Sequence, residues 1–196
     1  HIPDPQNYEN ILIRIKQHQE GLPGTVEFLN YQPSLKALLE AGEGENLEFK
    51  STFRWDIRDN KVNRNLEKAV MKTVAAFLNS RGGHLVLGVS DAKAIVGLHH
   101  DFATLGKENA DGFENHFSHV FRNMIGPEFR QFVRLHWSKK ENKDCCMVIV
   151  SPAPKPAYLK SEDNEEFYIR TGNGTTSLKF SEANAYIESR FKSKLI

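Results

Sequence analysis

The pattern of hydrophobic and polar positions between residues 43 and 91 predicts two strands joined by a long helix. Residues 47–50 alternate between apolar and charged side chains, which is the pattern of a strand with one buried face. Residues 84–89 are almost all apolar and predict a buried strand that leads to Asp91. Between the strands, helical spacing predicts an amphipathic helix over residues 62–80. The residues that recur at this spacing are Val62, Leu66, Ala69, Val70, Thr73, Val74, Phe77 and Leu78.

The remaining pattern predicts further helices, strands and turns, which together indicate an α/β fold with a mixed β-sheet packed by two main helices. The further helices are expected over residues 35–41, 111–124 and 181–191. The further strands are expected over residues 133–137, 145–150 and 166–170. A hairpin is expected over residues 85–98 with Ser90 to Lys93 at its turn, and exposed loops over residues 51–61 and 171–177.

Length and composition fit one folded domain. The chain has 196 residues, of which 39% are hydrophobic and 26% charged, which is enough for one core. Residues 33–192 are expected to form this domain, and residues 1–32 an N-terminal arm or linker helix. Because the chain begins at His1, we expect it to be part of a longer protein.

Charge and cysteine content limit the binding partners and the cellular location that we expect for the protein. The formal net charge of +1 gives no strong overall field for a polyanion, so any such binding must depend on local clusters. Cys145 and Cys146 are adjacent on a predicted strand and point to opposite faces, so we expect two reduced thiols and a cytoplasmic location. No apolar run approaches the ~20 residues of a membrane helix, and no signal peptide is visible, so no membrane contact is expected.

Three carboxylates are candidates for a shared metal site. Glu43 precedes the first strand of the 43–91 stretch, Glu48 lies on that strand, and Asp91 follows the second strand. Carboxylates without neighbouring Cys or His suit Mg²⁺ or Mn²⁺, and Lys50 could stabilise negative charge that develops during phosphodiester cleavage. The alternative is that Glu48 and Lys50 form only a surface ion pair, worth less than ~1 kcal/mol.

Basic side chains are candidates for contacts with phosphate groups. A row of cations at four-residue spacing lies on the predicted helix, and further ones occur in the loop before it, at a predicted hairpin tip and on a late strand. The candidates are Arg54, Arg58, Arg64, Lys68, Lys72, Lys139, Lys140, Lys143 and Arg170. The alternative is a solvated charged surface. The histidine pair His99 and His100 is interpreted as structural or exposed, and Gly172 to Thr176 as a tight turn in preference to a phosphate cradle.

Several segments, taken in order, resemble the Schlafen-type AlbA domain. The segments that carry the resemblance are Glu43 with 47–50, then 75–83, 87–91 with 95–98, 156–159 and 167–173 before a terminal helix. The resemblance covers roughly residues 35 to 190 and implies a single Schlafen AlbA-like lobe, a domain described in bacteria as a DNA-binding module. Related domains of animal Schlafens bind structured RNA. Some of them cut transfer RNA with three acids and a divalent metal. Matching the motifs places these acids on Glu43, Glu48 and Asp91, with Glu45 as an alternative to Glu43.

Three functions remain open at this point. The first is a nucleic-acid-binding module for structured RNA or duplex DNA, which reads the phosphate backbone and not the base sequence. The second is a Mg²⁺- or Mn²⁺-dependent endoribonuclease that uses the three acids and Lys50. The third is a regulatory domain that binds protein through the arm of residues 1–32. Because the animal enzymes pair two lobes and one is present here, a homodimer is expected.

Overall fold

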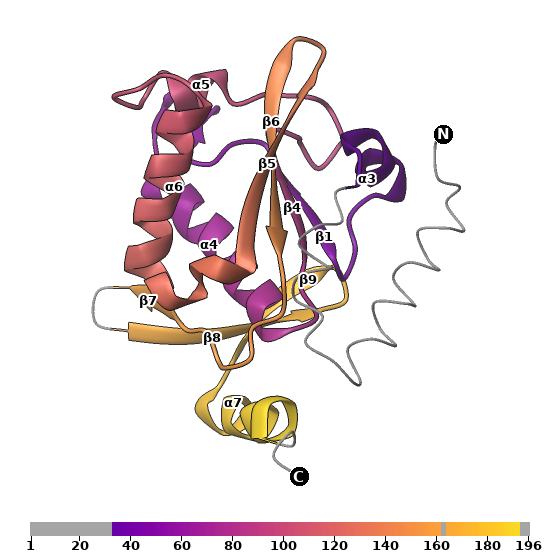
Figure 1. Ribbon diagram of the computed structural model, residues 1–196, viewed down its shortest axis with the longest axis vertical. Coiled ribbons are helices and arrows are strands. Elements are labelled where there is room, and N and C mark those ends of the chain that lie inside the picture. Colours follow the sequence, from indigo (N-terminus) through magenta and orange to yellow (C-terminus); the bar gives the residue numbers. More distant parts are fainter. Residues whose placement is uncertain (1–32, 162–163, 193–196) are drawn as a thin grey trace.

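The computed structural model describes residues 33–161 and 164–192, so the predicted arm of residues 1–32 lies outside the described part (Figure 1). The N-terminal half contains α3 (Leu35–Ala41), β1 (Leu47–Lys50), β2 (Trp55–Asp56), β3 (Lys61–Val62), α4 (Arg64–Asn79), β4 (Gly83–Leu87) and α5 (His99–Phe102). The C-terminal half contains α6 (Ala110–Met124), a 3₁₀ helix (Pro127–Phe132), β5 (Val133–Lys140), β6 (Lys143–Val150), β7 (Leu159–Ser161), β8 (Asn164–Thr171), β9 (Gly174–Leu178), α7 (Phe180–Ile187) and a π-helical turn (Glu188–Lys192).

The central sheet is mixed, as predicted. Its order is β1-β4-β6-β5, with β1 parallel to β4 and the other neighbours antiparallel. The two long helices α4 and α6 pack on one face, and the short helix α3 packs on the other (Figure 1). This arrangement explains why β4 and β6 have nearly continuous apolar sequences, since strands covered on both faces bury every side chain.

The helix α4 begins and ends where its sequence contains capping residues. Asn63 accepts a hydrogen bond from the backbone N–H of Asn65 at 3.0 Å, so it caps the first turn. After the helix, Gly82 has a positive φ of 75° and donates its N–H to the carbonyl of Phe77 at 3.0 Å. The helix is buried from Thr73 to Asn79 because it lies between the central sheet and β8.

A second, three-stranded antiparallel sheet with the order β7-β8-β9 packs against the other side of α4. Tyr168 of β8 joins the core beside α4, whereas Phe167 and Ile169 face α7. The buried Asn79 links α4 to this sheet, because its amide donates to the carbonyls of Ala157 at 2.8 Å and of Tyr168 at 2.9 Å. These two hydrogen bonds fix the second sheet on the end of α4.

The predicted tight turn at Gly172 is confirmed by its positive φ of 59°, and the predicted loop continues from Gly174 as β9, which pairs with β8. Two other predicted connections differ from the structure. The predicted exposed loop of residues 51–61 contains the β2–β3 hairpin, and Phe53 within it is wholly buried in the core. The predicted hairpin of residues 85–98 is reduced to a single bridge between Val89 and Ile95.

Both cysteines are free and buried, in agreement with the prediction of reduced structural thiols. Cys145 packs on the α3 side of the sheet and Cys146 on the side of α4 and α6, as alternation along a strand requires. Within the described residues, no helix has the length and apolar character needed to cross a membrane.

Candidate nucleic-acid interface

The second predicted acid, Glu48, lies beside Lys50, as the alternation along β1 predicted. Leu47 and Phe49 are buried, and the Lys50 ammonium lies 2.6 Å from one oxygen of Glu48. The other oxygen of Glu48 lies 3.0 Å from the guanidinium of Arg170. The carboxylate is therefore already neutralised by two cations of the protein itself.

The guanidinium of Arg170 is enclosed by the fold, so the prediction that it contacts phosphate is wrong. Its side chain is 1% exposed, and it lies over the ring of Phe77 with 5.0 Å to the ring centroid. It also donates to the carbonyl of Gly44 at 2.7 Å and to the hydroxyl of Thr175 at 3.0 Å. Arg170 thus links the turn before β1, β1 itself and β9.

The three predicted acids do not form one cluster. Glu43 accepts a hydrogen bond from the N–H of Phe49 at 2.8 Å, so it lies along the outer edge of β1, whereas Glu48 faces Arg170. The positive φ of 94° at Gly88 and the reverse turn from Ser90 carry the exposed Asp91 past the end of β4. Among residues 33–161 and 164–192, no three His, Cys, Asp or Glu side chains are placed to hold one ion. The residues in this arrangement therefore do not fit the predicted Mg²⁺ or Mn²⁺ site.

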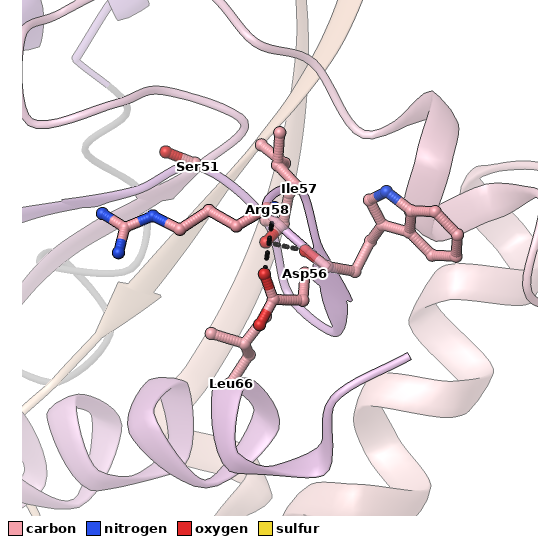
Figure 2. Close-up of a pocket in the computed structure, with 7 residues that line it drawn as sticks. Ser51, Asp56, Ile57, Arg58 and Leu66 are labelled. Atoms are coloured by element: carbon pink, nitrogen blue, oxygen red, sulfur yellow. Dashed lines mark hydrogen bonds between the residues drawn. The ribbon is translucent and has the colours of Figure 1, made fainter. Parts of the chain in front are cut away.

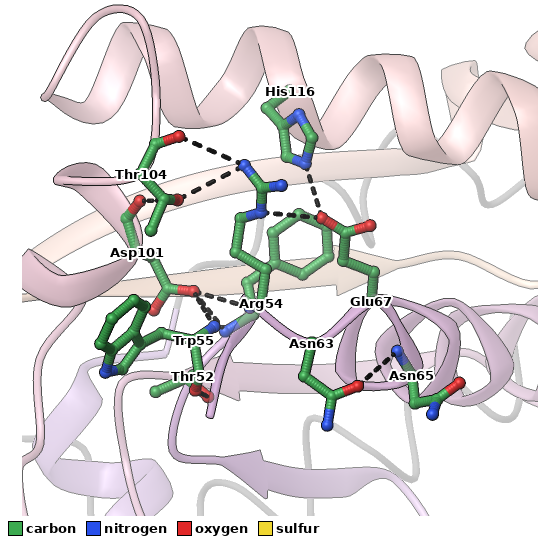
Figure 3. A network of polar contacts seen from close by, with 10 residues as sticks. Thr52, Arg54, Trp55, Asn63, Asn65, Glu67, Asp101, Thr104 and His116 are labelled. Carbon is green, nitrogen blue, oxygen red and sulfur yellow. Dashed lines mark hydrogen bonds and ion pairs between the residues drawn. The ribbon is translucent and has the colours of Figure 1, made fainter. Parts of the chain in front are cut away.

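Arg54, another predicted phosphate contact, has a structural role in a buried polar network (Figure 3). Its Nε lies 3.0 Å from a carboxylate oxygen of Glu67, and its Nη1 reaches the hydroxyl of Thr104 at 3.4 Å. The same oxygen of Glu67 lies 2.7 Å from Nε2 of His116 on α6. This network joins the segment after β1 to both long helices, and it leaves Arg54 only 15% exposed.

The predicted stripe on α4 is partly neutralised by β8. Lys68 lies 3.1 Å from the carboxylate of Glu166, and the ammonium of Lys72 lies 5.1 Å from the ring centroid of Tyr168. Hydrogen bonds from Tyr168 and then Lys68 lower the pKa of Glu166, so it remains a carboxylate beside the stripe. Burial, and next the bond to Glu166, raises the pKa of the Tyr168 phenol to about 12. Arg64 and Lys72 have no carboxylate within ion-pair distance in the described part of the chain.

The predicted basic hairpin tip is the end of a projecting arm, which we define as residues 138–145. Strand β4 pairs with β6 only up to Cys146, so beyond that point β5 and β6 pair with each other and extend past the sheet (Figure 1). Positive φ angles of 53° at Glu141 and 58° at Asn142 close the arm in a type I′ turn. Lys139, Lys140 and Lys143 all lie on this arm.

The arm is joined at its base to the segment that leads into α5. The ammonium of Lys143 donates to the carbonyl of Ile95 at 2.8 Å, and the N–H of Leu98 donates to the carbonyl of Asp144 at 3.0 Å. The next residue along the chain is His99, the first residue of α5. The arm and α5 are therefore held together at one end of the molecule.

His100 of α5 stacks with Trp55, and His99 lies tilted against His100, which sequence reasoning missed. The rings of His99 and His100 have centroids 3.9 Å apart, and those of His100 and Trp55 are 5.7 Å apart and nearly parallel at 14°. The prediction that His99 and His100 are exposed or structural identified their exposure but not this contact. Nothing in the sequence links position 55 to position 100, because only the tertiary fold brings them together.

Trp55 also lines a surface pocket beside β2 (Figure 2). The other lining residues are Ser51, Thr52, Asp56, Ile57, Arg58 and Leu66. The hydrogen bond from the Asn63 side chain, followed by one from the Asp59 N–H, lowers the pKa of Asp56. Ile57 is 46% exposed, and the exposed Arg58 has no carboxylate within ion-pair distance among the residues described. The pocket therefore combines an aromatic wall, the carboxylate of Asp56 and the guanidinium of Arg58, which has no ion-pair partner among the residues described.

Comparisons with known proteins agree with this fold. The family model for the Schlafen AlbA_2 domain matches residues 43–179. The DIP2311 protein of Corynebacterium diphtheriae is similar in structure, with a TM-score of 0.53 and 15% sequence identity over 88% of this chain. The match spans 32% of that protein, so the present chain corresponds to about a third of its length.

A second structural match is the N-terminal domain of a RecG-related protein from Nitrosomonas europaea. It has a TM-score of 0.44 and 21% identity, and the match covers 71% of this chain and 88% of that domain. A search of curated proteins found no significant match.

Proposed function

Because the chain belongs to the Schlafen AlbA_2 family, we propose that it binds nucleic acid, through the phosphate backbone, with the projecting arm as the main contact. The observation that carries this proposal is the placement of three lysines on a two-stranded ribbon that extends beyond the sheet. A ribbon of this kind fits the major groove of duplex DNA, which is about 12 Å wide.

The charges at the tip of the arm support binding to an anion. Lys140 and Lys143 are directly opposite each other in the strand register, and like charges in that position destabilise a hairpin. A bound phosphate between them would remove this repulsion. In the free protein Lys143 has one compensating contact, its hydrogen bond to the carbonyl of Ile95, and an anionic ligand at the tip would add a second.

Acidic residues on the arm limit the affinity that we expect for nucleic acid. Lys139 lies 3.7 Å from Asp144 on the opposite strand, and Glu141 occupies the turn, so the arm is only weakly cationic as a whole. The net charge of +1 adds no long-range attraction. We expect binding that rests on a few phosphate contacts, from the arm and from Arg58 in the neighbouring pocket. Three to four such contacts correspond to a slope of roughly −3 to −4 in a plot of log K against log salt for duplex DNA.

The proposal is tested by fluorescence anisotropy with a labelled DNA duplex, at salt concentrations from about 50 to 200 mM. The arm variant is Lys139→Ala with Lys140→Ala. The matched control is Lys179→Ala with Lys192→Ala, which removes two exposed lysines at the α7 end of the molecule (Figure 1). The arm variant should bind more weakly and reduce the size of the salt slope by about 2, since each phosphate contact contributes about 1.

Two results would contradict the proposal. One is binding by the unmodified protein that barely changes with salt, because phosphate contacts release counterions and must respond to salt. The other is an equal loss of affinity in the arm variant and the control. A third double variant, Lys68→Ala with Lys72→Ala, tests the α4 stripe: a larger loss there than in the arm variant would move the interface to α4 and β8.

A further inference from the structure

Next to the arm lie three aromatic rings that take no part in the proposed phosphate contacts. They belong to Trp55, His99 and His100, and we call them the His–Trp stack. The neighbouring phenylalanines Phe53 and Phe113 are wholly buried and serve the core. In contrast, His99 and His100 are exposed and Trp55 is half-buried, so the stack lies at the surface. Its rings therefore contribute little to the stability of the core. They offer a face on which another flat ring can stack.

The buried carboxylate of Asp101 fixes the backbone next to Trp55 (Figure 3). Asp101 is wholly buried, and its Oδ1 accepts hydrogen bonds from the N–H groups of Phe53 at 3.0 Å, Arg54 at 2.7 Å and Trp55 at 3.1 Å. Asp101 directly follows His100 in α5, so the same residue fixes the backbone on both sides of the contact between Trp55 and His100. The stack is consequently organised before any ligand arrives.

Two cations belong to the segments next to the stack. Lys143 of the arm donates to the carbonyl of Ile95, four residues before His99, and Arg58 lines the same pocket as Trp55. Desolvation, followed by the charges of His100 and Lys143, lowers the pKa of His99, so its imidazole is neutral at neutral pH. The surface therefore offers a neutral exposed ring, with positively charged side chains on the neighbouring arm and in the neighbouring pocket.

We propose that the His–Trp stack binds an unpaired nucleobase, with the phosphates on either side of that base held by Lys143 and Arg58. This inference rests on the proposed function and adds a substrate class to it: nucleic acid with a single-stranded segment, such as a duplex with an overhang. Every base has a flat π-face, so stacking on aromatic side chains tolerates any sequence, and cations that follow the strand complete the site. A blunt duplex keeps its bases paired and stacked, so it can use only the phosphate contacts.

Two substrates distinguish this inference from the proposed function. A labelled blunt duplex is compared with the same duplex carrying a single-stranded overhang, by anisotropy at one salt concentration. A stacked base is worth about 1–3 kcal/mol, so the unmodified protein should prefer the overhang by roughly 5- to 150-fold. The variant His99→Ala with His100→Ala should lose this preference and keep its affinity for the blunt duplex. His99→Phe with His100→Phe should restore the preference, because phenylalanine also stacks.

A matched control and a spectroscopic measurement complete the test. His119→Ala removes another exposed histidine, on α6, and should leave the preference unchanged. The chain has two tryptophans, so in a Trp137→Phe background the fluorescence comes from Trp55 alone. Adding a single-stranded oligonucleotide should quench this fluorescence, and the quenching should disappear in the His99→Ala, His100→Ala variant.

Equal, salt-dependent binding of both substrates by the unmodified protein overturns the His–Trp stack and leaves the proposed function intact. Unchanged Trp55 fluorescence on binding the overhang also overturns it. No binding of either substrate overturns both proposals. Quenching of Trp55 by a peptide in place of an oligonucleotide would assign the stack to a protein partner and would likewise contradict the inference.

Discussion

The guanidinium of Arg170 lies 3.0 Å from the carboxylate of Glu48, although the two residues are 122 positions apart in the chain. The pair joins the second sheet to the edge strand of the central sheet, and Lys50 completes a group of two cations around one acid. Because Arg170 is 1% exposed, this contact is part of the core of the protein and not of its surface. Glu48 was expected to bind a metal and Arg170 a phosphate, but in this fold the two residues bind each other and hold two sheets together.

Replacing Arg170 tests this role. Arg170→Met should lower the free energy of unfolding by about 3 kcal/mol or more, because it removes one partner of a buried ion pair and its hydrogen bonds to Gly44 and Thr175. The measurement is urea denaturation followed by circular dichroism. Arg58→Met removes an exposed arginine and should change stability by less than about 0.5 kcal/mol. Similar values for the two variants would show that Arg170 does not anchor the sheets.

The turn after α4 gives a second prediction, based on two glycines with similar backbone angles. Gly82 and Gly172 have φ of 75° and 59°, so alanine is strained at both positions, by about 1–2 kcal/mol. At Gly82 an added Cβ would also lie 2.5 Å from the carbonyl oxygen of Val150, whereas at Gly172 it meets no described atom within 4 Å. Gly82→Ala should therefore lower the melting temperature clearly more than Gly172→Ala. An equal effect of both would mean that the strand end at Val150 can move away.

The buried thiols give a third prediction. Burial raises the pKa of Cys145 to about 11 and raises that of Cys146 well above its usual value, so neither is a thiolate at neutral pH. Both should react with a disulfide reagent such as DTNB only as fast as the protein unfolds, and both should react at once in guanidinium chloride. Rapid modification of either thiol in the native protein would show that β6 opens locally.

The fourth prediction concerns pH and His84, which is buried in β4. Burial lowers its pKa from 6.5 to about 4, so the folded protein resists protonation of this ring. Between pH 6.5 and 4 the unfolded chain binds the proton and the folded protein does not, so stability falls as the pH is lowered through this range. The loss from His84 should total about 3 kcal/mol. The lowered pKa of His99 acts in the same direction.

The variant His84→Gln isolates this contribution. Its stability, measured by denaturation at several pH values from 7 to 4, should decline less steeply than that of the unmodified protein. His119→Gln, on the exposed face of α6, serves as the control and should keep the original slope. A slope that does not change in His84→Gln would assign the pH dependence to other histidines.

Much of the fold could be predicted because it depends on local periodicity. The apolar spacing of residues 62–80 agrees with α4, and the prediction of a helix at 111–124 agrees with α6 to within one residue. The alternation along residues 47–50 correctly placed Glu48 and Lys50 side by side. Caps and turns such as Asn63 and Gly82 act within a few residues of their own position, so the sequence around them contains the required information.

The candidate site could be predicted only in part, because its side chains depend on partners that are distant in the chain. The basic tip at Lys139, Lys140 and Lys143 was identified, since a hairpin is a local structure. Arg54 and Arg170 were expected to face a ligand, but Glu67 and Glu48 bind them. A charged residue has the same letter in the sequence whether its partner is solvent, a phosphate or a buried carboxylate.

The sequence by itself determined the helices, the strands, the burial of the two cysteines and the family of the domain, because these follow from spacing along the chain. Only the tertiary structure decided which charges remain available to a ligand, where Asp91 lies relative to Glu48, and that Trp55 stacks on His100. The physical reason is that burial and ion pairing depend on distances in space. In this fold those distances are set by the packing of α4 between two sheets and by the hydrogen bonds of Asp101.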